Sequence, residues 1–134
     1  MSQIYDVDAT VFAPCAMGAV INEDTVPRLR CAIVAGCANN QLESNQFGTA
    51  LEERGILYAP DYAINAGGLI NSAAELQGYD AARALQRVRR IRHVMTRIFA
   101  IAEREAIPTW QAADRMAEQR IRDISYTRQA FKAV

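Results

Sequence analysis

The chain has 134 residues, of which 51% are hydrophobic and 22% charged, and its formal net charge is zero. This composition is typical of a soluble globular domain and argues against disorder. No apolar stretch approaches the roughly 20 residues of a membrane-spanning helix, and the N-terminus lacks a basic segment followed by an apolar one, so we expect one cytoplasmic domain spanning residues 1–134.

Three short apolar runs lie in the first half of the chain. None of them alternates between apolar and polar residues, which is typical of strands buried on both faces of a parallel sheet. Each run ends at a proline or a glycine, residues that stop a strand. The runs cover residues 9–13, 31–35 and 56–59, and the residues that end them are Pro14, Gly36 and Pro60.

Two linking segments have helical signals. Asn22 is placed to cap a short helix whose first turn contains Glu23 and Asp24, because carboxylates favour the positive end of a helix. Residues 46–54 predict a second helix that Gly55 ends. The sequence therefore predicts a β-α-β-α-β unit with right-handed crossovers.

Beyond residue 68 every pattern is helical. Residues 70–76 predict a short helix, and residues 81–106 have apolar side chains at helical spacing. Pro108 ends that helix, Thr109 is placed to cap the next, and residues 110–124 continue it. We therefore expect an α/β fold with about three parallel strands and crossover helices, followed by two or three C-terminal helices.

The two halves of the chain differ in charge. Residues 1–80 contain three arginines and ten carboxylates, whereas residues 81–134 contain twelve basic and five acidic residues. Clustered arginine can indicate a nucleic-acid surface, but this stripe has no interleaved aromatic residues. We therefore expect a solvated or domain-facing helix surface and no nucleic-acid partner. The stripe consists of Arg83, Arg87, Arg90, Arg97 and Arg104.

The cysteines do not indicate a metal site. Cys15, Cys31 and Cys37 are an odd set without CxxC spacing, and His93 is the only histidine. We expect reduced thiols, a surface or packing role for His93, and no metal. Nothing near Cys15 in the sequence predicts a lowered pKa for its thiol.

Two polar segments follow the second and third apolar runs. Asn39 and Asn40 follow the second, and Asn65 precedes Gly67 and Gly68 after the third. In an open parallel sheet, ligands bind beyond the carboxyl ends of the strands. Carboxamides donate and accept hydrogen bonds, and glycines let a ligand approach the backbone. The alternative is that the three asparagines only cap turns.

Six short motifs occur along the chain: FAPCA at 12–16, ANNQL at 38–42, YAPDY at 58–62, INAGG at 64–68, IPT at 107–109 and AADRMAE at 112–118. In this order they resemble the leucine, phenylalanine and valine dehydrogenases, which are relatives of glutamate dehydrogenase, and the resemblance covers nearly the whole chain. It implies that the α/β fold is the second half of a Rossmann-like coenzyme domain.

The resemblance also implies NAD-dependent oxidative deamination of a hydrophobic L-amino acid. A hydride passes from the alpha carbon to nicotinamide, and water hydrolyses the imine to a 2-oxo acid and ammonia.

The same resemblance implies roles for particular residues. Those at 13–16 would line the nicotinamide and its ribose, Asn39 would lie near the carboxamide, and Asn65 beside the reacting centre. Relatives usually have an aliphatic residue at the position of Ser72, so a hydroxyl there implies a more polar substrate pocket. The coenzyme side comprises Ala13, Pro14, Cys15, Ala16 and Asn39, and the substrate side comprises Asn40, Asn65, Gly67, Gly68, Leu69 and Ser72.

The family's catalytic lysine, its proton-transferring aspartate and its GxGxxG turn find no counterpart in this sequence, which has no lysine before Lys132. We therefore expect no catalytic residue in the chain and no catalysis by it alone. The alternative is a non-catalytic remnant that serves as an assembly or binding module. The first strand would have an open edge, which predicts self-association or pairing with the family's missing domain.

Overall fold

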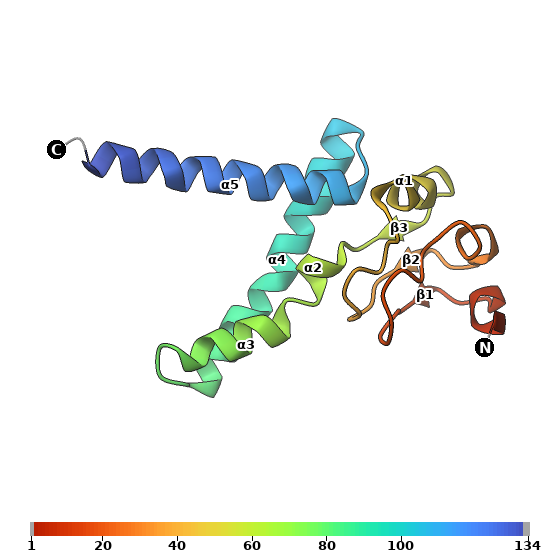
Figure 1. The fold of residues 1–134 in the computed structure, drawn as a ribbon, viewed down its shortest axis with the longest axis horizontal. Coiled ribbons are helices and arrows are strands. Elements are labelled where there is room, and N and C mark those ends of the chain that lie inside the picture. Colours follow the sequence, from red (N-terminus) through yellow and green to blue (C-terminus); the bar gives the residue numbers. More distant parts are fainter. Residues whose placement is uncertain (1, 133–134) are drawn as a thin grey trace.

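A computed structural model describes residues 2–132 and contains one sheet of three parallel strands (Figure 1). The strand order is β1-β2-β3, with Val11 beside Ile33 and Ile33 beside Leu57. The predicted parallel α/β architecture is confirmed. The regular ladder is shorter than the apolar runs predicted: β1 is Val11–Phe12, β2 is Ile33–Val34 and β3 is Leu57–Tyr58.

One face of the sheet is covered by the links between the strands. Val34 and Tyr58 point to this face and pack with residues of helix α1 (Asn45–Glu53) and of the 3-10 turn η2 (Val26–Arg28). The cluster is well packed, with Val34 and Leu51 both at 0% exposure. Burial of such large aliphatic side chains contributes roughly 1.5–3 kcal/mol each.

The opposite face is covered only near the carboxyl ends of the strands. There Ala35 and Ala59 pack against helices α4 (Ala81–Glu105) and α5 (Thr109–Lys132). Val11 and Leu57 remain 46% and 40% exposed. The expectation that the strands are buried on both faces is therefore wrong for this part of the sheet, because the two helices cross it at one end.

The links are held by the capping chemistry that the sequence predicts. The Asn22 side chain accepts hydrogen bonds from the backbone N–H groups of Asp24 and Thr25, both at 3.1 Å. The element that begins after this cap is the 3-10 turn η2 and not an α-helix. Gly55 has φ +69° just beyond α1, the left-handed conformation that glycine adopts without a steric penalty.

The C-terminal part is helical throughout. The long helix α4 packs against α5, against α3 (Gly67–Glu75) and against the short α2 (Asp61–Ile64), which the sequence patterns did not predict. Figure 1 shows α3 and the outer part of α5 projecting away from the sheet. No helix within residues 2–132 is long and apolar enough to cross a membrane.

Thr109 has a different role from the predicted cap. It is the first residue of α5, and its hydroxyl donates to the Tyr58 carbonyl at 2.7 Å. The hydroxyl therefore ties the start of α5 to the end of β3. The predicted domain of residues 1–134 includes residues 1, 133 and 134, which lie outside the described part of the chain.

Candidate functional site

Three loops gather at the carboxyl ends of the strands, which is where an open parallel sheet binds its ligands. The loops after β1 and β2 are in direct backbone contact, since the Ala38 N–H donates to the Pro14 carbonyl at 2.9 Å. Gly36 makes this approach possible: a Cβ on it would lie 2.0 Å from the Pro14 carbonyl oxygen. A glycine is therefore required here by close approach of two backbones.

Asn65 joins the loop after β3 to the loop after β2. Its side-chain NH2 donates to Asn39 Oδ1 at 2.6 Å and to the carbonyls of Cys37 and Ala38 at 3.3 and 3.4 Å. Asn39 is exposed and Asn65 is half-buried. Two of the three predicted asparagines therefore form one pair across the strand ends.

A buried polar latch lies behind this pair. The Asp61 carboxylate, 6% exposed, accepts the Gln41 backbone N–H at 2.6 Å. The Gln41 side-chain NH2 donates to the carbonyls of Gly36 and Ala38 at 2.9 and 3.0 Å. Gln41 is fully buried, and no described residue donates to its Oε1. Sequence reasoning missed the latch, although an acidic residue directly after Pro60 in a first helical turn was a visible signal.

Asn40 lies on another side of the same loop. It has φ +52° and lines a hollow of about 150 Å³ together with Tyr58, Asp61 and Tyr62. Burial and the Asp61 carboxylate raise the pKa of Tyr58. Burial and its hydrogen bond to Asp114 raise the pKa of Tyr62. Both phenols therefore stay protonated at physiological pH; the Tyr62 hydroxyl donates to Asp114 at 2.7 Å, and the Tyr58 hydroxyl accepts the Asp61 N–H at 3.3 Å.

The remaining predicted site residues differ in their surroundings. Pro14 is buried, whereas Ala13 and Ala16 are exposed. On α3, Leu69 and Ser72 share one helix face and are exposed. A Cβ on Gly67 would contact Val88 and Ile91 of α4, so this glycine lies against α4, whereas a Cβ on Gly68 would meet open space.

Cys15 has a lowered pKa, which corrects the expectation from sequence. The backbone N–H of Cys37 is the main cause, and the Cys37 thiol is the second. The Cys15 sulfur in turn raises the pKa of Cys37. Both thiols are exposed. The sequence did not reveal this neighbour because the two cysteines come from different strand ends.

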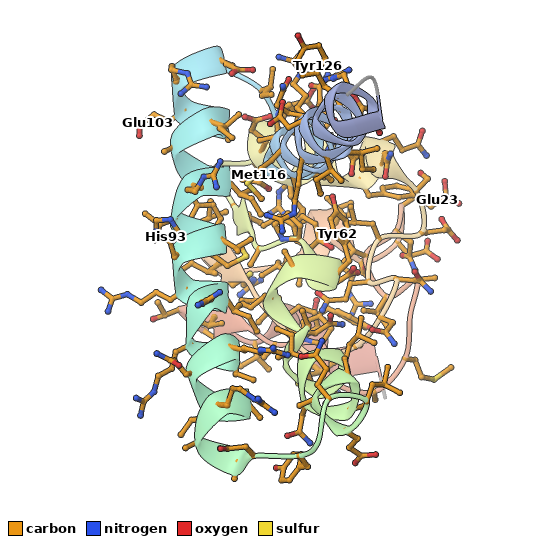
Figure 2. All side chains as sticks on the ribbon, turned by 90° about the vertical axis from the view of Figure 1, so that its left-hand side faces the viewer. Glu23, Tyr62, His93, Glu103, Met116 and Tyr126 are labelled. Carbon is orange, nitrogen blue, oxygen red and sulfur yellow. The ribbon has the colours of Figure 1, made fainter. Side chains whose placement is uncertain are left out.

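Other features lie away from these loops. An apolar groove of about 470 Å³ runs between α1, β3 and the turn from α4 to α5, and none of the predicted site residues lines it. His93 is exposed on the outer side of α4 (Figure 2). Trp110 packs on the main core. Among the described residues, no three His, Cys, Asp or Glu side chains gather to hold a metal ion.

Two arginines of the basic stripe have local partners. Arg83 donates to the carbonyls of Gln77 and Gly78, and Arg87 donates to the Gln77 side chain at 2.9 Å. These bonds close the turn between α3 and α4. They give part of the stripe a structural role within this hairpin.

Comparison with known proteins agrees with this architecture. The family model for glutamate/leucine/phenylalanine/valine dehydrogenase matches residues 1–128. The chain belongs to this family. It is 54% identical over 129 residues to a leucine dehydrogenase from Thermoactinomyces intermedius. It superposes on a crystal structure of L-tryptophan dehydrogenase from Nostoc punctiforme with a TM-score of 0.88 at 47% identity.

The match covers a limited part of each relative. It takes in 96% of this chain but 35% of the leucine dehydrogenase, and 91% of this chain but 37% of the tryptophan dehydrogenase. A hetero-hexameric glutamate dehydrogenase from Thermus thermophilus has the same fold, with a TM-score of 0.77 at 21% identity. That match covers 94% of this chain and 32% of the glutamate dehydrogenase chain. The chain thus spans about a third of the length of these dehydrogenases.

Proposed function

We propose that this chain forms the nicotinamide- and substrate-facing part of an NAD-dependent amino-acid dehydrogenase that acts on a hydrophobic L-amino acid. The observation that carries the proposal is the Asn39–Asn65 hydrogen bond of 2.6 Å, which joins two loops at the carboxyl edge of a parallel sheet. The relatives that match this chain are dehydrogenases of such amino acids by name. The chain holds no lysine in the described loops that would act as the family's base.

The loops suit a nicotinamide in chemistry and in shape. Ala13, Cys15 and Ala16 are small and exposed, so they leave room for a flat ring and its ribose. The Asn39 NH2 is a donor for a carboxamide oxygen, and the pairing with Asn65 fixes its orientation. A bound nicotinamide would accept the hydride from the amino acid; the residues of this chain would orient its ring and exclude water from one side.

The substrate side would be formed by Asn65, Gly68, Leu69 and Ser72, whereas Asn40 lines the separate hollow beside Tyr62 and Gly67 lies against α4. Leu69 is 76% exposed and presents an apolar surface on the same helix face as the Ser72 hydroxyl. A pocket built on this face would accept an apolar side chain and would also offer one hydrogen bond. We therefore propose a substrate with an apolar side chain that tolerates a polar atom.

The test is a titration of the isotopically labelled chain, followed by NMR of its backbone and side-chain amides. Reduced nicotinamide mononucleotide should shift the amide signals of Asn39 and Asn65 with a dissociation constant of about 1 mM or weaker. NADH should bind no more than about tenfold tighter, because the chain lacks the glycine-rich turn that anchors a pyrophosphate. AMP should leave these signals unchanged.

Two variants separate this proposal from its alternative. Asn39→Ala should abolish the shifts, whereas Gln46→Ala, which removes an exposed amide from α1, should leave them intact. Shifts that spread evenly over the chain, or no response to any nicotinamide, would instead support a non-catalytic assembly or binding module. Tight, salt-sensitive binding of an oligonucleotide would contradict both proposals.

The open edge of β1 supports a second proposal, that the chain associates through this strand with another chain or with the domain its relatives contain. The carbonyls of Thr10 and Phe12 accept from β2, so the backbone groups of Val11 face outward. An apolar groove of about 230 Å³ runs along this edge and includes Ile4, Val7 and Val11. Unpaired edges of this kind invite strand addition.

Sedimentation equilibrium of the whole chain tests the association. We expect a mass above that of the monomer, which Val11→Lys shifts toward the monomer because a lysine on an edge strand opposes pairing. Leu57→Lys on the opposite edge strand is the matched control and should keep the association. A clean monomer for the unaltered chain would refute self-association through this strand.

A further inference from the structure

Cys15 and Cys37 stand side by side at the carboxyl ends of β1 and β2. In the register of the sheet, Phe12 is the partner of Val34. Beyond the ladder the pairing slips by one residue, because the Ala38 N–H donates to the Pro14 carbonyl. Cys15 follows Pro14, and Cys37 lies between Gly36 and Ala38, which both contact Pro14, so the two cysteines lie on adjoining segments. Hydrogen-bonded neighbouring segments lie about 4.7–4.9 Å apart, which is within the roughly 4.4–6.8 Å between Cα atoms that a disulfide spans.

The backbone keeps the two loops at this spacing beyond the regular ladder. The Ala35 N–H donates to the Phe12 carbonyl at 3.0 Å, and the Ala38 N–H donates to the Pro14 carbonyl at 2.9 Å. The close approach of Gly36 to Pro14 adds a steric constraint between the same two segments. Backbone contacts between the two segments therefore keep the two cysteines close, whatever rotamers their side chains adopt.

The two thiols are accessible and unequal. Both are exposed, and neither is in a disulfide. The Cys37 backbone N–H and thiol lower the pKa of Cys15, and the Cys15 sulfur raises the pKa of Cys37. A low-pKa, accessible thiol beside a second thiol is the arrangement that reacts with peroxides and is then closed by its neighbour.

We propose that Cys15 and Cys37 form an oxidisable thiol pair, in which Cys15 reacts first with a hydroperoxide and Cys37 closes an intramolecular disulfide. The Cys15 thiolate attacks the O–O bond of hydrogen peroxide and becomes a sulfenic acid, while the departing hydroxide takes up the thiol proton as water. The Cys37 sulfur then attacks the Cys15 sulfur, and the second oxygen leaves as water. Two thiols lose two electrons and two protons, and the peroxide is reduced to two waters.

The third cysteine serves as the internal control. Cys31 is half-buried against the main core and lies just before β2, away from the pair. Trypsin cuts after Arg28, Arg30 and Arg54, so Cys15 falls in peptide 1–28 whereas Cys31 and Cys37 share peptide 31–54. A Cys31→Ala background therefore makes the peptide assignment unambiguous.

The test is treatment of the whole Cys31→Ala chain with one equivalent of hydrogen peroxide, followed by thiol titration after unfolding and by mass spectrometry. We expect both thiols to disappear, a mass loss of two hydrogen atoms, and a peptide 1–28 linked to peptide 31–54. Adding Cys15→Ser should slow the loss of the remaining thiol by roughly tenfold or more. Adding Cys37→Ser or Cys37→Ala should leave Cys15 as a sulfenic acid that a dimedone-type reagent traps.

Other outcomes overturn the proposal. In the Cys31→Ala chain, one such outcome is that Cys15 gains oxygen while Cys37 stays reduced. The others are that disulfides form only between chains or that both thiols remain intact. Circular dichroism of each variant checks that the comparison is between folded chains. The disulfide does not depend on the coenzyme proposal; if that proposal also holds, the oxidised chain should show at least a tenfold weaker response to reduced nicotinamide mononucleotide.

Discussion

The sheet half of the molecule (residues 2–64) and its helical half (residues 67–132) are stabilised in different ways. Large side chains such as Ile21, Val34 and Leu51 fill the core of the sheet half and are fully buried. The core between α4 and α5 is built mainly from alanines around Met95 and Ile98. The helical half also leaves large apolar side chains open to solvent, with Leu69 at 76% and Leu76 at 89% exposure.

Polar side chains show the same difference. In the sheet half they satisfy backbone groups far away in sequence: Asp61 accepts from Gln41, and Arg54 donates to the carbonyls of Val26 and Leu29. In the helical half most polar bonds are local, such as the cap at Asp80. The sheet half therefore fixes its shape within this chain, whereas the exposed apolar faces of the helices are surfaces suited to contact with other protein.

Truncation of a large core residue is the strongest test of this comparison. Leu51→Ala should lower the free energy of unfolding by about 2–5 kcal/mol, because the residue is fully buried and its removal leaves a cavity. Leu76→Ala, at an 89% exposed position, should change it by less than about 0.5 kcal/mol. Urea unfolding followed by circular dichroism measures both. Equal losses would mean that the helical half is as tightly packed as the sheet half.

Removal of the Asp61 carboxylate tests the Gln41–Asp61 latch within the sheet half. Asp61→Ala should cost about 1–3 kcal/mol, since it leaves the buried Gln41 N–H without its acceptor. Asp61→Asn keeps an acceptor oxygen and should recover part of the loss, and Asp8→Ala at an exposed site should have little effect. Urea unfolding gives the stability, and the NMR signals of the Asn39 and Asn65 side chains report the loop. Unchanged signals in Asp61→Ala would show that the latch does not position the asparagine pair.

The presence of three parallel strands was predictable from sequence, whereas their length was not. Continuous apolar runs that end at Pro14, Gly36 and Pro60 predicted three parallel strands, and these are present. The ladder has only two residues per strand. Strong local signals located the long helix α4 well: it was expected at 81–106 and spans Ala81–Glu105.

The site was predictable only in part because its contacts join distant segments. The resemblance pointed to Asn39 and Asn65, but no periodicity showed that they pair across 26 residues. The Gln41–Asp61 latch and the Cys15–Cys37 neighbourhood depend on strand register. The sequence contained one usable signal for the cysteines: each stands the same distance beyond its strand. Caps such as Asn22 were predictable because donor and acceptor are close in sequence.

The turn from α4 to α5 allows a smaller test. Ala106 has φ +50° at the C-cap of α4, a conformation that costs a non-glycine residue roughly 1–2 kcal/mol. Ala106→Gly should therefore raise the stability by up to about 1 kcal/mol, although the unfolded glycine has more freedom. The matched change Ala100→Gly, at an exposed position inside α4, should lower it by about 0.5–1 kcal/mol. Thermal melts of the two variants should shift in opposite directions.

The smallest expected effect is the pH dependence of the cap on α4. The Asp80 carboxylate accepts the Arg83 N–H at 2.9 Å, and this bond holds the Asp80 pKa below its ordinary value of 3.8. A lowered pKa in the folded state means that the stabilisation is present above the unfolded pKa and is lost as the pH falls through the folded one. The contribution of Asp80 should therefore be constant near neutrality and fade below about pH 4.

Asp80→Asn isolates this effect, because asparagine also caps a helix but does not titrate. The melting temperature of the unaltered chain minus that of the variant should be constant between about pH 5 and pH 7 and should decrease toward more acidic pH. Asp6 and Glu105 also have lowered pKa values, caused by neighbouring arginines, but they are present in both chains and cancel in the difference. If the difference in melting temperature does not change with pH, the charge of Asp80 does not stabilise the helical half. The difference in stabilisation between the helical half and the sheet half would then be a difference in packing alone.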